Sequence, residues 1–307
     1  MAQSSTAYGR GKVIVFGEHA VVYGRPAVAC SLPHGATATL VRSDSPTWSI
    51  AHPGGTIETD EAMLCAGRRL LAEFDLSPSE LSVDVKLTIP VGAGLGSSAA
   101  MAVAVGRAAA HCQGLSEERS QTSLADAVAA SEAVFHGNAS GIDQQAALGG
   151  GFFSFSRREN SPRFVPLDVP KSRWVIAQVA PSTSTAEMVE SVALLRKRQP
   201  EIIDSLLDEF ALVADAGCRA LQDGRWRDVG DLMNLNQGLL NALGVSTPEL
   251  EDACVAARKA GGLGAKLTGS GGGGCIVVLT DDDRAQSVEE ALEEKGDVYS
   301  FSLPPER

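Results

Sequence analysis

Residues 81–112 have the sequence LSVDVKLTIPVGAGLGSSAAMAVAVGRAAAHC. The fold is predicted first from this segment and then from the residues on either side of it. Residues 81–89 alternate apolar and polar side chains, which predicts a half-buried strand that ends at Pro90. Residues 97–112 are rich in alanine and valine and are followed by Gly114, which predicts a buried helix. A strand, a glycine-rich loop and a helix therefore follow one another here.

The loop at residues 90–100 has the order and composition of a phosphate-binding loop. Gly92, Gly94 and Gly96 allow the backbone to approach a bulky anion, and the N–H groups and dipole at the helix start favour negative charge. Ser97 and Ser98 supply hydroxyl groups where a Walker loop binds Mg²⁺, but no Gly-Lys-Ser/Thr sequence accompanies them. Tight packing of the helix on the strand is the alternative, and we favour the phosphate-binding role.

A second glycine-rich loop, residues 269–274 (GSGGGG), matches the pattern G-x-G-x-x-G. A dinucleotide-binding loop of this pattern leads into a helix, whereas residues 275–279 (CIVVL) predict a strand. This context excludes the dinucleotide-binding interpretation. A hairpin between two strands and a loop that contacts a ligand remain equal alternatives.

The net charge and the cysteine pattern of the chain exclude some classes of function. The chain has 307 residues, of which 38 are acidic and 26 are Lys or Arg, giving a net charge of −12. This charge argues against non-specific binding to nucleic acid or to a membrane surface, although a local basic pocket for a small anion is allowed. The 6 cysteines lack C-x-x-C spacing, and the start of the chain has no apolar signal segment, so a cytoplasmic location is expected.

The remaining pattern places helices in groups between strands, which favours an α+β fold over a doubly wound sheet. Further strands are predicted at residues 12–16, 152–155, 174–179, 265–267, 275–279 and 298–301. Further helices are predicted at residues 124–135, 186–197, 201–221, 226–243, 248–260 and 283–294. The polar, proline-containing residues 157–172 predict a boundary between two domains, residues 1–172 and 173–307.

Several charged residues are candidates for chemistry, each with a simpler alternative. Lys12, Glu18 and His19 lie at the first strand and the turn after it, and singly they fit a solvated lysine, a surface glutamate and a hydrogen-bonded histidine. Glu132 shares an apolar helix stripe, where an ionised carboxylate needs a cation such as Mg²⁺ or a stripe-edge position that reaches solvent. Asp143 follows a Ser-Gly turn, so a helix N-cap is its alternative.

Together, these segments resemble the motifs of the GHMP small-molecule kinases, in the form typical of the mevalonate kinases. Residues 11–24 (GKVIVFGEHAVVYG) resemble the first motif, residues 90–100 the second and residues 266–275 (KLTGSGGGGC) the third. Residues 132–143 (EAVFHGNASGID) resemble the HGNPSGxD stretch of mevalonate kinases. Arg10, Met101 and Ala139 depart from the family pattern, which usually has Pro, an aromatic residue and Pro at these places.

The resemblance implies a two-domain GHMP kinase-like fold of the α+β class, with the active site between the domains. The N-terminal α+β domain would bind ATP, and the C-terminal domain would be ferredoxin-like. The implied reaction transfers the γ-phosphoryl group of ATP to the primary hydroxyl of (R)-mevalonate, giving 5-phosphomevalonate for isoprenoid precursor biosynthesis. Mg²⁺ is the implied cofactor.

The resemblance also implies roles by position. Asp143 would be the catalytic carboxylate and Lys12 the lysine paired with it near the hydroxyl. Ser98 and Glu132 would be the Mg²⁺ ligands. Glu18, His19 and Thr185 would lie near the substrate. The ATP phosphates would be bound at Gly92, Gly94, Leu95, Gly96, Ser97 and Ser98.

Three other functions stay open within this resemblance. Phosphomevalonate kinases and homoserine kinases share the motifs. A non-catalytic metabolite-sensing relative would be expected to lack Lys12 or Asp143, and both are present. The expected partners are mevalonate and ATP, with no nucleic acid and no membrane, and a homodimer is left open.

Overall fold

The computed structural model describes residues 4–135, 141–158 and 161–305, without the side chains of residues 117–121, 132–133, 135, 157–158 and 161. The chain packs into two compact units. Unit 1 comprises Met1–Gly11, His34–Val91 and Gly96–Gly149, and unit 2 comprises Lys12–Pro33, Gly92–Leu95 and Gly150–Arg307. Strands β1 (Ser4–Phe16) and β2 (Ala27–Arg42) contribute residues to both units. The domain boundary after residue 172 stays a prediction from the sequence.

Unit 1 contains the predicted strand of residues 81–89, observed as β5 (Leu81–Leu87). Its alternation is confirmed, because the apolar residues Leu81, Val83, Val85 and Leu87 are all buried. β5 pairs antiparallel with residues 36–42 of β2 and parallel with β3 (Trp48–His52), which pairs in turn with β4 (Gly55–Ile57).

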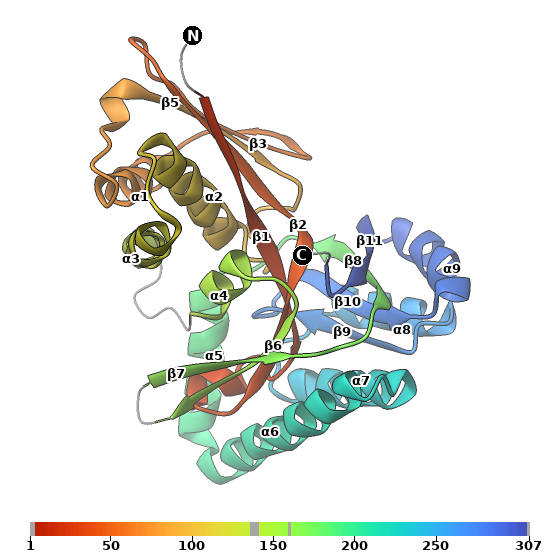
Figure 1. Cartoon of the computed structure of the whole chain (residues 1–307). Helices are drawn as coiled ribbons and strands as arrows, with labels where there is room; N and C mark the ends of the chain where they lie inside the picture. Colours follow the sequence, from red (N-terminus) through yellow and green to blue (C-terminus); the bar gives the residue numbers. More distant parts are fainter. Residues whose placement is uncertain (1–3, 136–140, 159–160, 306–307) are drawn as a thin grey trace. The chain divides into compact units, whose positions relative to one another are not determined.

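Three helices of unit 1 pack together: α1 (Glu61–Ala72), α2 (Ser97–Cys112) and α3 (Glu117–Phe135) (Figure 1). α2 has the bounds that the sequence predicts, and it also packs on β5. α3 begins at Glu117, earlier than the predicted start at residue 124. The short helix α4 (Ile142–Leu148) contacts α2.

Unit 2 contains a four-stranded antiparallel sheet in the order β11-β8-β10-β9. Its strands are β8 (Ser172–Ala180), β9 (Gly264–Thr268), β10 (Gly274–Thr280) and β11 (Asp297–Leu303). The intervening helices are α5 (Thr185–Arg198), α6 (Pro200–Gln222), α7 (Trp226–Ala242) and α8 (Pro248–Lys259) before β9, and α9 (Asp282–Glu293) before β11. This order is that of a ferredoxin-like β-α-β-β-α-β motif, which confirms the expected α+β class.

No strand is predicted from the sequence between residues 157 and 172, but the structure has one there. β6 (Phe152–Arg158) and β7 (Ser161–Leu167) form an antiparallel hairpin, and residues 27–30 of β2 pair with β6. The Phe164 ring lies 5.0 Å from that of Phe155 and 5.9 Å from that of Phe153, between ring centroids. Pro162 and Pro166 argue against a strand in the sequence, but proline is tolerated because β7 is an edge strand.

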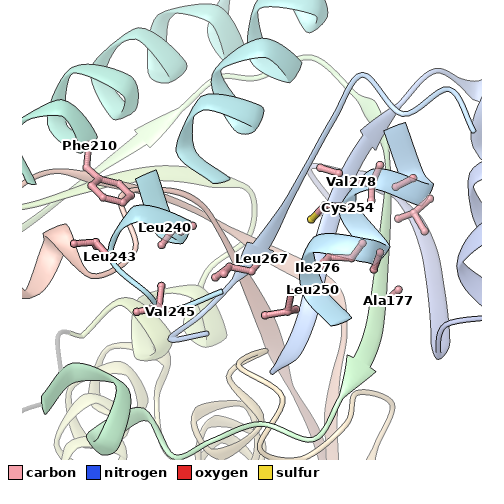
Figure 2. Packing of buried hydrophobic residues seen from close by; sticks show 14 of the residues in the cluster. Ala177, Phe210, Leu240, Leu243, Val245, Leu250, Cys254, Leu267, Ile276 and Val278 are labelled. Carbon is pink, nitrogen blue, oxygen red and sulfur yellow. The ribbon is translucent and has the colours of Figure 1, made fainter. Parts of the chain in front are cut away.

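The core of unit 2 fills the space between the four-stranded sheet and its helices. Figure 2 shows Leu250 and Cys254 of α8 beside Ile276 and Val278 of β10. α8 and α9 contact each other and the sheet. Lys266 is a charged residue in these apolar surroundings, and it is fully buried on the short strand β9. Within the described residues, every helix is too short or too polar to cross a bilayer.

Two glycines of α7 provide a matched test of this packing. A Cβ at Gly230 would lie 2.5 Å from the carbonyl oxygen of Leu263, whereas a Cβ at Gly238 would meet nothing within 4 Å. We expect Gly230→Ala to destabilise the protein by about 1–3 kcal/mol through overpacking against backbone. Gly238→Ala should instead stabilise it by about 0.4–1 kcal/mol, because alanine is the better helix former. Urea unfolding measures both, and equal effects would contradict the close packing of α7 on residue 263.

Candidate active site

The loop before α2 requires glycine at alternate positions. Gly92, Gly94 and Gly96 have φ angles of 71°, 79° and 73°, which side chains rarely adopt. Gly96 is the N-cap residue of α2, and no side chain caps this helix start. The first N–H groups of α2 therefore lack the usual capping oxygen, as expected where a helix start binds an anion. Ser97 is buried, and Ser98 is half-buried.

The two glycine-rich loops lie in backbone contact within unit 2. A Cβ at Gly94 would lie 3.2 Å from the carbonyl oxygen of Thr268, and a Cβ at Gly269 would lie 3.2 Å from Cα of Gly94. Residues 269–273 connect the antiparallel neighbours β9 and β10. The second loop is therefore a hairpin, and the lack of side chains lets it pack against the first loop.

Strand β1 is tied to both loops at the position of Lys12. The backbone N–H of Lys12 donates to the carbonyl oxygen of Leu95 at 2.9 Å. The Thr268 hydroxyl accepts from the N–H of Ile14 at 3.0 Å and lies 3.1 Å from its carbonyl oxygen, to which it donates. The Lys12 side chain is buried. The structure thus brings Lys12, predicted from the first motif, to the residues of the other two motifs.

Glu18 is enclosed by protein partners. Its carboxylate forms an ion pair with the ammonium group of Lys266, and the side chains of both residues are 0% exposed. The amide of Asn236 on α7 donates to the other carboxylate oxygen, Oε2, at 3.2 Å. Burial lowers the pKa of Lys266, while the attraction of Glu18 opposes this effect. Neither Lys266 nor Asn236 is predicted from the sequence as a site residue, although Lys266 is the one charged residue in the strand GAKLT.

His19 adopts a strained backbone. Its φ and ψ angles are 59° and −48°, and the N–H of Ala20 donates to the carbonyl oxygen of Glu18 at 2.6 Å. These features define the rare γ-turn with positive φ at its centre. Such backbone strain costs on the order of 1–3 kcal/mol and persists where the surrounding structure enforces it, often at functional sites.

The hydrogen bonds of His19 fix its tautomer. Nε2 lies 2.7 Å from the carbonyl oxygen of Ser270, and because a carbonyl only accepts, Nε2 carries the proton. The other ring nitrogen, Nδ1, is buried and has no hydrogen-bond partner in the described structure. Burial lowers the pKa of His19, and the bond to Ser270 opposes this shift. A neutral ring therefore offers one lone pair, at Nδ1.

Thr185 reaches the same loop residue as His19. Its hydroxyl lies 3.4 Å from the Ser270 hydroxyl. Ser270 thus joins two of the residues predicted to lie near the substrate. Ser270 is not predicted from the sequence as a site residue, because nothing but its place in the glycine loop distinguishes it.

Asp143 and Glu132 belong to unit 1. Asp143 is the second residue of α4, and the N-cap is Gly141, so the N-cap alternative for Asp143 is wrong. A carboxylate in the first helical turn still faces a favourable dipole. Glu132 falls within α3, but its side chain lies outside the described structure, as do residues 136–140 of the same motif.

The donor set proposed for Mg²⁺ fits that ion in chemistry. Ser98 offers a hydroxyl oxygen and Glu132 a carboxylate, and Mg²⁺ prefers such oxygen ligands. No group of three or more His, Cys, Asp or Glu gathers among the residues that the structure describes. Mg²⁺ is usually held by one or two protein groups together with substrate phosphates, so a larger protein cluster is not required.

An apolar cavity lies beside Ser98 in unit 1. Its volume is about 50 Å³, and its lining includes Trp48, Met63, Met101 and the hydroxyl-bearing residues Ser98 and Ser131. A cavity of this volume is well below the roughly 300–1,000 Å³ of typical ligand pockets, so it does not by itself indicate a ligand.

Comparisons with known proteins agree with the motifs. The GHMP kinases N terminal domain model matches residues 62–151, and the GHMP kinases C terminal model matches residues 219–298. The mevalonate kinase of Pyrococcus horikoshii is 36% identical over 294 residues, covering 87% of this chain and 86% of that protein. The mevalonate kinase of Methanothermobacter thermautotrophicus is 36% identical over 283 residues, covering 89% of each.

A solved structure extends this similarity to the whole fold. The L. major mevalonate kinase, in complex with R-mevalonate, matches with a TM-score of 0.86 at 26% identity. The match covers 99% of this chain and 97% of that chain.

The buried neutral state of His19 predicts a pH dependence of stability. Because the folded-state pKa is lowered, the unfolded chain binds a proton below about pH 6.5 that the folded chain does not. Stability should therefore fall as the pH drops below that value, by up to about 1.4 kcal/mol per pH unit for this group.

His19→Asn should flatten this slope, since asparagine tolerates positive φ and does not titrate. Burial lowers the pKa of His34 as well, so some slope should remain. His111→Asn, which changes an exposed ring, is the control. Urea unfolding from pH 5 to pH 8 measures the slopes, and an unchanged slope in His19→Asn would contradict a neutral buried His19.

Proposed function

The chain belongs to the GHMP kinases, and we propose that it transfers the γ-phosphoryl group of ATP to the primary hydroxyl of (R)-mevalonate. The observation that carries the proposal is the 36% identity to mevalonate kinases over most of both chains. The product would be 5-phosphomevalonate, which serves isoprenoid precursor biosynthesis. The 6 cysteines are all free thiols, which supports a cytoplasmic location.

We assign ATP phosphate binding to the loop before α2. Phosphoryl transfer depends mainly on positioning and on neutralising charge, with little covalent chemistry for the protein to perform. The positive φ angles of Gly92, Gly94 and Gly96 turn the backbone without side chains, and the N–H groups of Ser97 and Ser98 begin an uncapped helix. These features support phosphate binding through backbone donors, with Leu95 inside the same loop.

We assign Mg²⁺ binding to Ser98 and Glu132. Mg²⁺ held there would supply positive charge that neutralises the phosphates. The role of this chain is to present the Ser98 hydroxyl beside the phosphate-binding N–H groups and to supply one carboxylate. Both are the hard oxygen donors that this ion prefers.

We assign the acceptor hydroxyl to Asp143 and Lys12. The Asp143 carboxylate accepts the hydrogen bond of that hydroxyl and orients it, and it takes the proton as bond formation advances. The Lys12 ammonium offsets negative charge as it develops. His19, with its open Nδ1 lone pair, and Thr185 bind polar groups of the acceptor.

An acceptor panel tests the proposed function. Purified protein with Mg²⁺ and ATP should phosphorylate mevalonate with a higher kcat/KM than phosphomevalonate, homoserine or galactose. Coupled detection of ADP measures each rate, and mass spectrometry identifies the product. Faster turnover of another acceptor would show that the substrate assignment is wrong.

The two carboxylates should respond differently to substitution. Asp143→Asn should lower kcat by about 10²–10⁴-fold at any Mg²⁺ concentration, because the group acts on the hydroxyl. Glu132→Gln should require more Mg²⁺ and recover in part when it is supplied, because it removes one ligand charge. Asp126→Asn, at an exposed position of α3, is the control and should leave the kinetics unchanged. Rescue of Asp143→Asn by Mg²⁺ would contradict its assignment.

A further inference from the structure

The γ-turn at His19 needs support from outside the turn. Its central residue has a φ of 59°, a value that a histidine rarely adopts. Such a conformation persists only where the surrounding structure leaves no relaxed alternative. The residues that hold the turn therefore determine where the His19 ring lies.

Two elements of unit 2, strand β9 and helix α7, form hydrogen bonds with the residues that precede His19 in the γ-turn. Lys266 of β9 forms the ion pair with Glu18 and donates a second hydrogen bond to the carbonyl oxygen of Leu267 at 2.6 Å. Asn236 of α7 accepts from the N–H of Gly17 at 3.4 Å and donates to Glu18 Oε2 at 3.2 Å. The two residues that precede His19 are thus held by β9 and α7.

Strand β9 also leads into the residue that binds the His19 ring. Ser270 follows Lys266 closely, and its carbonyl oxygen accepts the bond from His19 Nε2 at 2.7 Å. The side-chain carbonyl of Gln237 accepts from the N–H of Leu267 at 2.8 Å and anchors β9 to α7. The ion pair and the His19–Ser270 bond are therefore two connections between the same two segments.

We propose that the buried Glu18–Lys266 ion pair is a positioning device that holds His19 in its γ-turn, and that Glu18 acts on the substrate site only through this pair. The proposal rests on the proposed function in that His19 is taken to bind the phosphoryl acceptor. It makes Lys266 and Asn236 positioning residues. It also replaces direct substrate contact by Glu18, because both carboxylate oxygens have protein partners and the residue is 1% exposed.

An ion pair suits this task better than an apolar contact. If the turn relaxed and moved Glu18 away, both Glu18 and Lys266 would become uncompensated charges in a buried site. Apolar side chains can slide and repack at much lower cost. Relaxation of the strained backbone at His19 would therefore require the ion pair to break, which is energetically costly.

A double-mutant cycle tests the proposal, using Glu18→Gln, Lys266→Met and both together. We expect each of the three variants to raise the acceptor KM by about tenfold while the ATP KM stays unchanged, as loss of an acceptor-binding contact predicts. The double variant should be no worse than either single one, because the two residues act as one unit. If Glu18 touched the acceptor directly, Lys266→Met would leave the acceptor KM unchanged, and that result would overturn the proposal.

Imidazole ¹⁵N NMR of His19 supplies a readout that stability alone would not move. The wild-type ring should show the Nε2–H tautomer and a depressed pKa, and all three variants should lose this tautomer preference and titrate closer to pH 6.5. Glu289→Gln, which breaks the partly buried Arg173–Glu289 pair, is the control. It should lower Tm without changing the acceptor KM or the His19 signals. An unchanged His19 spectrum in the folded pair variants would overturn the proposal.

The double variant and the His19 spectrum allow a conclusion even if the single variants do not fold or the enzyme does not use mevalonate. If the single variants do not fold, the double variant leaves no unpaired buried charge, so its His19 spectrum and acceptor KM decide the question. A raised acceptor KM with a wild-type His19 spectrum would mean that Glu18 touches the substrate. If the wild-type protein does not phosphorylate mevalonate, the acceptor assignment fails, and the His19 spectrum still tests the ion pair.

Discussion

The buried ion pair between Glu18 and Lys266 is the interaction on which the described site in unit 2 depends. Removing one partner from such a pair typically costs about 3–5 kcal/mol, because it leaves an uncompensated charge in a medium of low polarity. This is a large share of the roughly 5–15 kcal/mol by which a typical protein is stable. The pair is therefore costly to break, and it lies next to the strained His19.

Backbone contact between two loops is the second constraint. A Cβ on Gly94 would lie 3.2 Å from the carbonyl oxygen of Thr268, and a Cβ on Gly269 would lie 3.2 Å from Cα of Gly94. The glycine N-cap of α2 also leaves the first N–H groups of this helix without a side-chain cap. One sequence feature, clustered glycine, thus serves both the packing of the loops and the binding of phosphate that we propose.

His19 and Asp143, two of the described site residues, lie in different local environments. The bond from His19 Nε2 to Ser270 fixes a neutral tautomer and leaves Nδ1 as an acceptor. Asp143 instead lies in the first turn of α4, where the N-terminal end of the helix dipole interacts favourably with a carboxylate. The fold therefore positions these two groups by different local causes: burial with one directed hydrogen bond for His19, and the start of a helix for Asp143.

Local patterns in the sequence determined most of the elements and the glycine loops. The bounds of α2 and the positions of α5 to α9 follow from helical periodicity and end signals, which depend on neighbouring residues. The predictions failed where tertiary pairing overrides local signals. β7 contains two prolines, and β2 contains Pro33 and Gly35, yet both strands pair with neighbours.

The sequence also selected Lys12, Glu18, His19 and Asp143 from their motifs, and it predicts that Glu18 lies near the substrate. Only the tertiary structure placed Glu18 against Lys266, which lies 248 positions away, and against Asn236, 218 positions away. The residues next to a charged side chain in the sequence do not indicate its ion-pair partner, because that partner depends on how strands and helices pack. For that reason the motifs predict which groups are available for chemistry, whereas the fold decides which of them are held in place by one another.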